Sequence, residues 1–258
     1  MFSKIVTNSV WQGCRIGAGF LALFLSPKIY AKSPSQILEI IRKIPHSGYS
    51  EGLDFHEGFL WHALPKEIVK IDPKDGQVLA RFSPASEYSE SIKWFKGSLW
   101  NLSFSDNGLY QGELKKDQFL FKKVGTLPEP HGWGIEQVGN ELVVSGNFSS
   151  HLYFYDPQKL KWGRVLKTEA SEIEDLAWDG EWLWSSSFSS HSGKIFALDI
   201  KTGKIQSFWE LPEKDQCPVI DGIALQGKTF WITGKDCPSI YQVKIPKQRT
   251  LTSESPKK

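Results

Sequence analysis

The stretch Asp175–Phe188, DLAWDGEWLWSSSF, carries the pattern that decides the fold of this 258-residue chain. A short apolar strand turns at Asp179–Gly180 and continues into a second strand that is rich in aromatic residues. Four further segments repeat the pattern: GLDFHEGFLWHAL from Gly52, SIKWFKGSLWNLSF from Ser91, GIEQVGNELVVSGN from Gly134 and GIALQGKTFWITGK from Gly222. Their starts lie 39–47 residues apart, a period that is typical of four-stranded β-propeller blades.

Two more strands complete most repeats, because a third strand ends in a turn such as DPKDG (72–76) and a fourth follows, such as VLARF (78–82). Glycine in these turns supplies the positive φ that a hairpin needs. The fifth repeat ends one strand short, and the stretch 35–46, SQILEIIRKIPH, is available to pair there. Such pairing leaves no open sheet edge. The sequence therefore predicts an all-β, five-bladed β-propeller closed by an N-terminal strand. A short amphipathic helix over 35–43 is the alternative.

The first 31 residues differ in kind from the rest. A basic, polar lead precedes the ten apolar residues IGAGFLALFL (16–25), and Ala31 is a plausible cleavage position. So short a run falls below the ~20 apolar residues of a membrane-spanning helix. We expect a signal peptide over 1–31, a propeller over 32–247 and a disordered polar tail over 248–258. An uncleaved N-terminal anchor is the alternative, and in both cases the folded part is exported to the periplasm or secreted, with no other membrane association.

Charge argues against nucleic acid as a partner. Without residues 1–31 the chain has 28 basic and 29 acidic side chains, and no basic stripe remains. The exported part keeps two cysteines, Cys217 and Cys237, in a compartment that permits disulfides. If Asp221 pairs with Gly234 across the last hairpin, both cysteines leave it at the same end, within disulfide reach. We expect that disulfide, with two free thiols as the alternative, and no metal site.

The register of the repeats places a set of polar residues at one end of the central channel, since the first strand of each blade lines that channel. Directly before that strand stand, in blade order, Glu51, Glu90, Trp133, Glu174 and Asp221. The second strand returns to the same rim and ends in the five blades at Pro65, Phe104, Asn147, Phe188 and Lys235. We therefore expect a ring of four acids that faces one ammonium group, with Trp133 either in the site or simply plugging the channel.

At these residues the sequence resembles the plant-type, propeller glutaminyl-peptide cyclotransferases, also called glutamine cyclotransferases. The matching elements are Tyr49-Ser50-Glu51-Gly52-Leu53, Ser89-Glu90-Ser91, Gly132-Trp133-Gly134, Glu174-Asp175-Leu176-Ala177, Asp221-Gly222-Ile223-Ala224, and Thr233-Gly234-Lys235 with Pro238. The resemblance implies that an N-terminal glutamine closes on its own side chain to give pyroglutamate and ammonia, without a cofactor. The implied partner is a peptide or protein with N-terminal glutamine, and we expect a monomer.

The resemblance also implies roles for individual residues. Glu90 is the candidate general acid and base, and Lys235 and the indole N–H of Trp133 are candidates to stabilise the developing oxyanion. The candidate substrate-binding residues are Tyr49, Glu51, Tyr88, Phe104, Glu174, Phe188 and Asp221. Neighbouring acids are expected to raise one carboxyl pKa towards the range that acid–base chemistry uses.

Several positions depart from the family pattern. Acids stand in place of two amides, at Glu51 and Glu174, and Ala177 and His131 each replace a glutamate. Phenylalanines replace tryptophans at Phe104 and Phe188. The more anionic pocket still attracts an ammonium group, but it lacks two amide donors. Two alternatives therefore stay open: a non-catalytic propeller that binds cationic peptide ends or a protein partner, and a Ca²⁺-dependent lactonase-type hydrolase whose channel acids hold the metal. Lys235 at the same rim disfavours the second.

Overall fold

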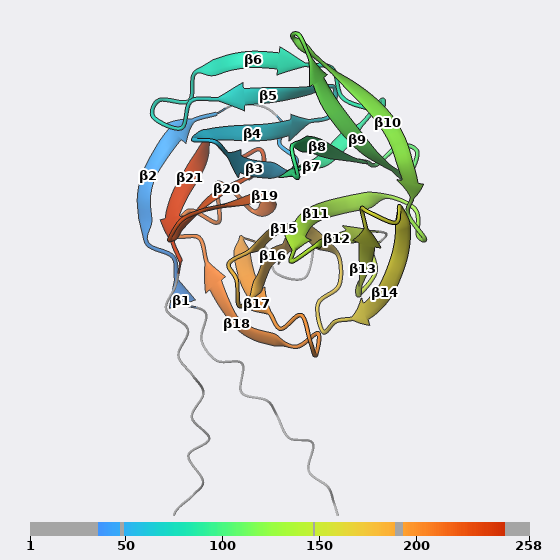
Figure 1. The fold of residues 1–258 in the computed structure, drawn as a ribbon. Helices are drawn as coiled ribbons and strands as arrows, with labels where there is room; N and C mark the ends of the chain where they lie inside the picture. Colours follow the sequence, from blue (N-terminus) through green and yellow to red (C-terminus); the bar gives the residue numbers. More distant parts are fainter. Residues whose placement is uncertain (1–35, 47–48, 147, 189–192, 246–258) are drawn as a thin grey trace, which may run out of the picture. The chain divides into compact units, whose positions relative to one another are not determined.

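In the computed structural model five β-sheets, the blades, follow one another around a central axis (Figure 1). The structure describes residues 36–46, 49–146, 148–188 and 193–245. The predicted signal peptide, the predicted tail and Asn147 lie outside these residues. The described part contains 21 strands and includes no helix long and apolar enough to cross a membrane.

Each blade contributes its first strand to the axis. Blade one contains β3 (Leu53–His56), β4 (Phe59–Leu64), β5 (Glu67–Ile71) and β6 (Val78–Phe82), and blade two contains β7 (Ser89–Phe95), β8 (Ser98–Ser103), β9 (Gly108–Lys115) and β10 (Gln118–Thr126). Blade three contains β11 (Gly132–Val138), β12 (Glu141–Gly146), β13 (His151–Asp156) and β14 (Lys161–Lys167). Blade four contains β15 (Ile173–Trp178), β16 (Leu183–Ser187), β17 (Lys194–Leu198) and β18 (Ile205–Glu210). Blade five contains β19 (Val219–Gln226), β20 (Thr229–Lys235) and β21 (Ser239–Lys244).

An N-terminal strand closes the ring, which confirms the predicted propeller and rejects the helix over 35–43. Strand β2 (Ile40–Pro45) pairs antiparallel with β21, with Ile44 opposite Ile240. A second pairing was not predicted: β1 (Gln36–Ile37) runs parallel to β18 of blade four. Leu38, which lies between β1 and β2 in the sequence, is buried, and its N–H donates to the carbonyl of Glu210 (2.9 Å). The N-terminal segment therefore joins blades four and five.

Aromatic side chains fill the space between neighbouring blades. Trp184 of blade four is fully buried and contacts Trp209 of its own blade and Phe230 of blade five, with ring centroids 4.8 and 5.0 Å apart. Such rings fit the pleated, half-buried faces of strands and pack favourably at these distances. The repeated aromatic second strand of the sequence is thus the surface on which one blade packs against the next.

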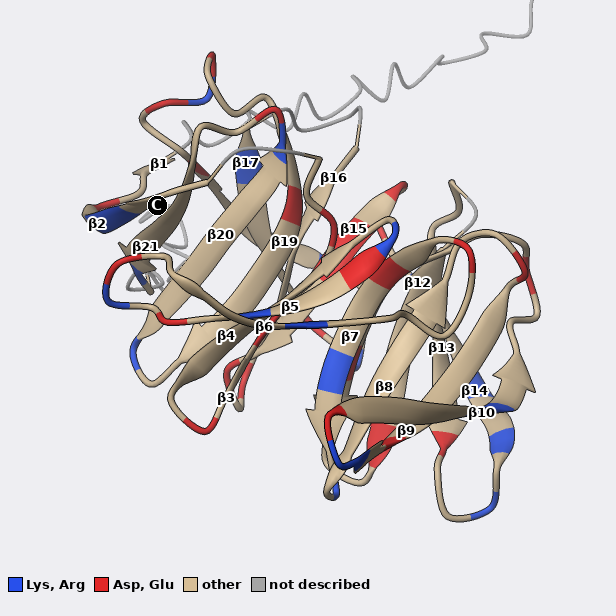
Figure 2. Cartoon of the chain, turned by 90° about the horizontal axis from the view of Figure 1, so that it is seen from above, with Lys and Arg blue, Asp and Glu red and all other residues tan. Residues whose placement is uncertain are grey.

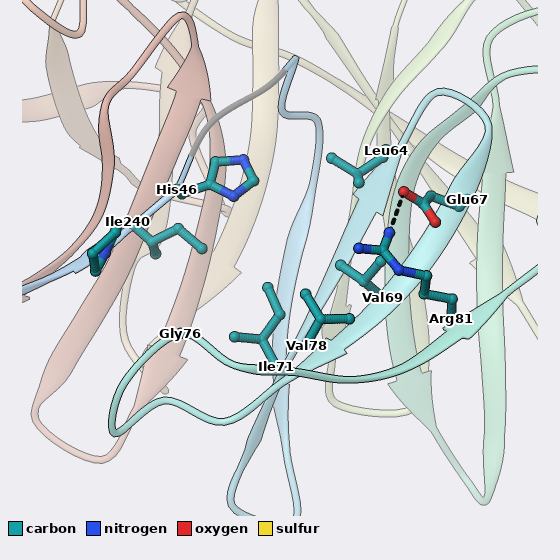
Figure 3. A pocket seen from close by; sticks show the side chains of 10 residues that line it. His46, Leu64, Glu67, Val69, Ile71, Gly76, Val78, Arg81 and Ile240 are labelled. Atoms are coloured by element: carbon teal, nitrogen blue, oxygen red, sulfur yellow. Dashed lines mark hydrogen bonds and ion pairs between the residues drawn. The ribbon is translucent and has the colours of Figure 1, made fainter.

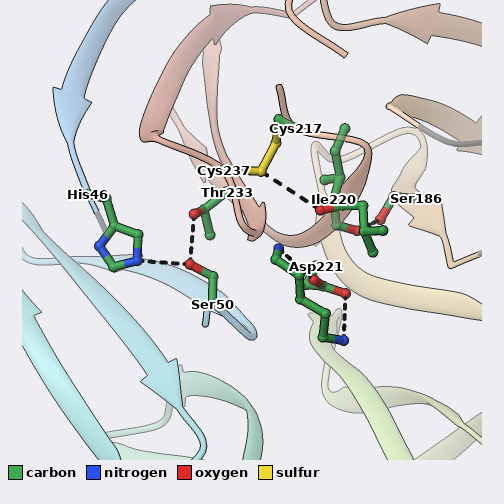
Figure 4. Close-up of a disulfide and its surroundings, with 10 residues drawn as sticks. His46, Ser50, Ser186, Cys217, Ile220, Asp221, Thr233 and Cys237 are labelled. Carbon is green, nitrogen blue, oxygen red and sulfur yellow. Dashed lines mark hydrogen bonds and ion pairs between the residues drawn. A yellow bond between two sulfur atoms is a disulfide. The ribbon is translucent and has the colours of Figure 1, made fainter. Parts of the chain in front are cut away.

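The two cysteines form a disulfide, Cys217–Cys237, with Cα atoms 4.4 Å apart (Figure 4). The register that led to this prediction was wrong by one residue, because Ile220 and not Asp221 pairs with Gly234. The bond ties the segment before β19 to the residues just after Lys235. Next to it, the hydroxyl of Ser50 lies 3.0 Å from that of Thr233, which links blade one to blade five.

Replacing both cysteines with serine is expected to lower the stability of the oxidised protein by about 3 kcal/mol, because the bond closes a loop whose ends are 20 residues apart. For a domain of this size the melting temperature should fall by roughly 6–12 °C. Differential scanning calorimetry of the double variant measures the change. The control is the wild-type protein under reducing conditions, which should have the same melting temperature as the variant. Equal melting of the variant and the oxidised wild type would contradict the expectation.

Candidate active site

Four of the five predicted rim residues sit at irregularities in the inner strands. The pairing of inner and second strand shifts between Ser89 and Ser91, between Gly132 and Ile135, between Ile173 and Leu176, and between Ile220 and Gly222. Glu90, Trp133, Glu174 and Asp221 lie within these shifts. The prediction that they precede the strand is therefore wrong, and holds only for Glu51. A bulge frees one residue from the ladder and re-aims its side chain, which is why bulges recur next to functional sites.

The bulge that carries Glu90 is held by a buried amide. Asn101 on β8 is fully buried, and its Nδ2 donates to the hydroxyl of Ser89 (2.8 Å) and to the carbonyl of Ser91 (3.1 Å). These partners flank Glu90 on both sides. Asn101 therefore holds both residues that flank Glu90, although the position of Glu90 itself is unpaired in the ladder.

Lys235 brings acids from two blades together at the end of β20. Its Nζ donates to Asp221 Oδ1 (3.1 Å) and lies 3.5 Å from Glu51 Oε2, and its backbone N–H donates to Asp221 Oδ2 (2.9 Å). The hydroxyl of Tyr88 donates to the other oxygen of Glu51 (2.5 Å). Of the four acids predicted to face one ammonium group, Glu51 and Asp221 therefore contact it directly. Figure 4 shows the Asp221 contacts beside the disulfide.

A pocket of about 180 Å³ opens at this end of the channel. It is lined by Tyr49, Tyr88, Glu90, Phe104, Trp133, Phe148, Glu174, Phe188 and Lys235. Glu51 and Asp221 reach it through their contacts with Lys235. All ten polar and aromatic site residues predicted from the sequence are thus brought together. Figure 2 shows acidic positions, in red, on β15 and β19.

Aromatic rings form the walls and the mouth of this pocket. Phe104 contacts the ring of Tyr88 (5.3 Å between centroids) and stacks on His131 from the other side (4.3 Å). Trp133 is buried and meets Phe148 edge-on at 4.6 Å. Within the described chain, the exposed aromatic side chains are Tyr49, Phe148 and Phe188, with exposed fractions of 48, 55 and 39%. All three line this pocket, so the mouth is apolar and the floor is acidic.

Burial shifts the floor acids towards their protonated forms. Loss of hydration, together with the nearby carboxylate of Glu51, raises the pKa of Glu90 well above its usual range. Burial likewise raises the pKa of Glu174 well above its usual range, assisted by Asp221. Burial raises the pKa of Glu51 to about 7, although Lys235 opposes the shift. For Lys235 the surrounding acids outweigh burial, so its pKa is raised and the ammonium form persists.

These shifts predict that the folded protein loses stability as the pH rises from about 7 to about 9. A carboxyl whose pKa is higher in the folded state binds protons more tightly there, and its stabilising contribution is lost as the pH passes that value. Glu51 titrates at about 7 and Asp175 at about 8. His46 and His62, whose pKa values burial lowers, act in the opposite sense but below this window. The melting temperature should fall by roughly 5 °C, and less in Glu51→Gln. A constant or rising value across the window would contradict this expectation.

The family model described as glutamine cyclotransferase matches residues 18–245. The chain belongs to the glutamine cyclotransferase family. The match covers every blade of the described propeller and confirms the resemblance carried by the sequence motifs.

One solved structure supports the propeller fold of this glutamine cyclotransferase. A glutaminyl cyclase from Myxococcus xanthus superposes with a TM-score of 0.70 at 18% identity, covering 81% of this chain and 97% of that one. A catalytically inactive virginiamycin B lyase from Staphylococcus aureus gives a TM-score of 0.49 at 16% identity, covering 76% and 66%. None of the curated proteins matches in sequence. At this identity the first likeness supports the propeller fold alone.

A second charged cluster crosses the channel of the glutamine cyclotransferase below the pocket. Lys93 Nζ lies 2.8 Å from both Asp54 and Glu136, and all three side chains are largely buried. These residues occupy one register in β3, β7 and β11, where blades four and five present Ala177 and Ala224. None of them lines the pocket. Variants of this cluster can therefore serve as controls, because they remove a buried ion pair that lies outside the site.

A larger pocket of about 280 Å³ lies elsewhere, between the outer strands of blades five and one (Figure 3). Its walls are mainly apolar, and its charged groups Glu67 and Arg81 form an ion pair with each other (2.6 Å). None of the predicted site residues reaches it. The chemistry indicated by the sequence and this larger pocket are therefore separate features of the glutamine cyclotransferase.

Two residues of the site were not predicted. Phe148 contributes an exposed ring at the mouth, and its only signal in the sequence is that it follows the rim position Asn147. Asp175 was quoted within a motif but given no role, although it is 1% exposed and accepts hydrogen bonds from two backbone N–H groups of other blades. The sequence feature that could have identified Asp175 is that an acid stands at a position of the aligned repeats where three other blades have glycine.

Proposed function

We propose that this protein is a glutaminyl-peptide cyclotransferase, which converts the N-terminal glutamine of peptides or proteins to pyroglutamate and releases ammonia. The observation that carries the proposal is the convergence of the buried Glu90 and the ammonium group of Lys235 on one pocket. Membership of the glutamine cyclotransferase family supports the same reaction class. No cofactor enters the proposed reaction.

The proposed reaction needs one group to move a proton between two nitrogens. The α-amine attacks the side-chain carbonyl carbon of its own glutamine, so a C–N bond forms and the ring closes. A free α-amine has a pKa near 8 and is mostly protonated at neutral pH, so it must lose a proton before it attacks. Glu90 in its carboxylate form takes that proton and returns it to the side-chain nitrogen, which leaves as ammonia. The extra proton on the ring nitrogen then passes to the freed carboxylate and on to water, which leaves neutral pyroglutamate. The raised pKa of Glu90 favours this role, because a weakly acidic carboxyl both accepts and donates near neutral pH.

Charge in the pocket suits both the substrate and the intermediate. An α-ammonium group is attracted by the ionised forms of Glu51, Glu174 and Asp221 before it is deprotonated. As the ring closes, negative charge develops on the former carbonyl oxygen. Lys235 has three N–H donors, of which Asp221 and Glu51 engage two. The third contacts the side chain of Tyr49 and can turn to the oxyanion when substrate binds, and Trp133 supplies the second proposed donor.

The apolar part of glutamine matches the walls. Its two methylene groups fit between Phe104 and Phe188, with Tyr49 and Tyr88 closing the remaining sides. The substrate peptide beyond its first residue leaves through the mouth formed by Tyr49, Phe148 and Phe188. The site therefore accommodates an N-terminal residue and excludes an internal glutamine, whose preceding peptide unit would have to enter the acidic floor.

A non-catalytic propeller that binds cationic peptide ends is the second candidate function. It is favoured by the acids at Glu51 and Glu174, which retain attraction for an ammonium group while removing amide donors. The calcium-dependent hydrolase is less well supported. Lys235 lies within 3.5 Å of Glu51 and Asp221, so the cation that these carboxylates need is part of the chain.

Ammonia release from a glutamine-initiated peptide, followed with and without a chelator, tests these candidates together. The proposal predicts release that the chelator does not change. No release from protein that contains bound metal would favour the metal-dependent hydrolase. Peptide binding without release would favour the non-catalytic propeller and overturn the proposed function.

We further propose that the propeller is exported as a monomer after removal of residues 1–31, leaving 32–247 folded and 248–258 as a tail. The disulfide supports an oxidising compartment, the periplasm or the exterior. N-terminal sequencing of the exported protein tests the cleavage site, and light scattering tests the monomer. A retained leader or a stable dimer would contradict the respective part.

A further inference from the structure

Asp175 occupies the centre of the propeller beneath the proposed active site. Its Oδ2 accepts the backbone N–H groups of Leu53 (2.8 Å) and Ile223 (3.1 Å), and its Oδ1 accepts the hydroxyl of Ser91 (2.6 Å). These donors belong to β3, β19 and β7, while Asp175 itself lies on β15. One carboxyl group therefore joins four of the five inner strands.

Each of the three donors follows an acid of the site by one or two residues in the sequence. Leu53 comes two residues after Glu51, and Ser91 comes directly after Glu90. Ile223 comes two residues after Asp221. The remaining acid, Glu174, is the residue before Asp175 itself. Three of the acids therefore lie within two residues of a hydrogen-bond donor to Asp175, and the fourth, Glu174, is its neighbour in the chain.

The neighbouring positions leave room on the axis for little more than the side chains of Asp175 and Ser91. The residues at the register of Asp175 in the other blades are Gly52, Ser91, Gly134 and Gly222. A Cβ at Gly52 would lie 2.4 Å from Ser91 Oγ, and one at Gly134 would lie 2.4 Å from the carbonyl oxygen of Glu174. Real Cβ atoms do not approach so closely, so these strands meet around Asp175 because three of them lack side chains there.

We propose that Asp175 is a positioning residue that sets the register of the acids Glu51, Glu90 and Asp221 from three other blades. It does not line the pocket, so it acts through the backbone and not on the substrate. Its use in catalysis rests on the proposed function, but its role as the shared anchor of the acids does not. Of the three bonds, only the one from Ser91 comes from a side chain, so a single substitution can remove it and keep the other two.

Removing the bond to blade two tests the proposal without breaking the axis. Ser91→Ala deletes the hydroxyl that binds Asp175 and keeps both backbone bonds. We expect Glu90 to lose its alignment while Glu51 and Asp221 keep theirs, so kcat should fall about 10-fold with KM changed less than about 2-fold. Ser98→Ala is the matched control, since Ser98 is a buried serine of the same blade whose hydroxyl accepts from Gln111. A kcat for Ser91→Ala equal to that of the control would overturn the proposal.

Asp175→Asn separates geometry from charge. The amide oxygen can accept both backbone N–H groups, and its NH₂ group can donate to Ser91 Oγ once that hydroxyl turns. A positioning role therefore predicts rescue, with kcat within about 3-fold of the wild type. A loss as large as that expected for removing Glu90 would assign Asp175 a role through its ionisable proton and overturn the proposal.

Crystal structures of Ser91→Ala and Asp175→Asn keep the test independent of activity. If the wild type releases no ammonia, the proposed function fails, but the anchor is still tested. The anchor predicts a displaced Glu90 carboxyl in Ser91→Ala, with Glu51 and Asp221 unmoved, and all three unmoved in Asp175→Asn. An unmoved Glu90 in Ser91→Ala would overturn the anchor whether or not the protein is an enzyme.

Discussion

Replacing Glu90 with glutamine is expected to lower kcat roughly 1,000-fold while changing KM little. Glutamine has nearly the same shape as glutamate, so the walls and the bulge of β7 keep their positions. It cannot accept a proton from the α-amine or return one to the leaving nitrogen. Steady-state ammonia release over a range of peptide concentrations gives both constants.

The control for this variant is Glu136→Gln. Glu136 is also a buried acid of an inner strand, but it is bonded to Lys93 below the pocket. The same chemical change there should cost stability and leave kcat within about 3-fold of the wild type. Full activity of Glu90→Gln would remove this residue from the mechanism, and equal losses in both variants would reduce the effect to a general disturbance of the channel.

Replacing Lys235 with methionine is expected to have the second large effect, on catalysis and on stability. The variant keeps most of the side-chain volume but loses the ammonium group that Asp221 and Glu51 share. Leaving these acids buried without their partner should cost about 3 kcal/mol at neutral pH. Loss of a donor to the oxyanion should lower kcat roughly 100-fold or more. Chemical denaturation and ammonia release measure the two effects.

Lys93→Met is the matched control for the second prediction. Lys93 has the same exposed side-chain fraction as Lys235, 15%, and also lies between two buried acids. We expect a similar loss of stability, measured under the same conditions, with kcat of the folded protein unchanged. An equal fall of kcat in both variants would contradict the oxyanion role of Lys235.

The fold was predictable because its signals are local. Each blade carries its own turn glycines and its own aromatic strand, so the period of GFLW, GSLW and EWLW could be read without knowing the pairing. The closing strand followed from a requirement of the whole sheet, since the fifth repeat lacked a fourth strand. The parallel pairing of β1 with blade four has no comparable signal, because two residues contain no periodicity.

The site was predictable in its membership but not in its geometry. A bulge is a property of strand pairing, so nothing in the residues around Glu90 or Asp221 showed that the ladder skips them. The lower cluster could have been recognised, because Asp54, Lys93 and Glu136 share one register in the aligned repeats. The axial role of Asp175 became visible only when the distances between blades were known.

The central claim is that acids from separate blades, with Lys235, convert N-terminal glutamine to pyroglutamate. Mass spectrometry of a peptide whose N-terminal glutamine carries heavy nitrogen in the side-chain amide tests it most directly. The account predicts that the peptide loses one molecule of ammonia, that the label leaves with it, and that the loss depends on Glu90. An unchanged peptide, or one converted to N-terminal glutamate by the addition of water, would contradict the claim.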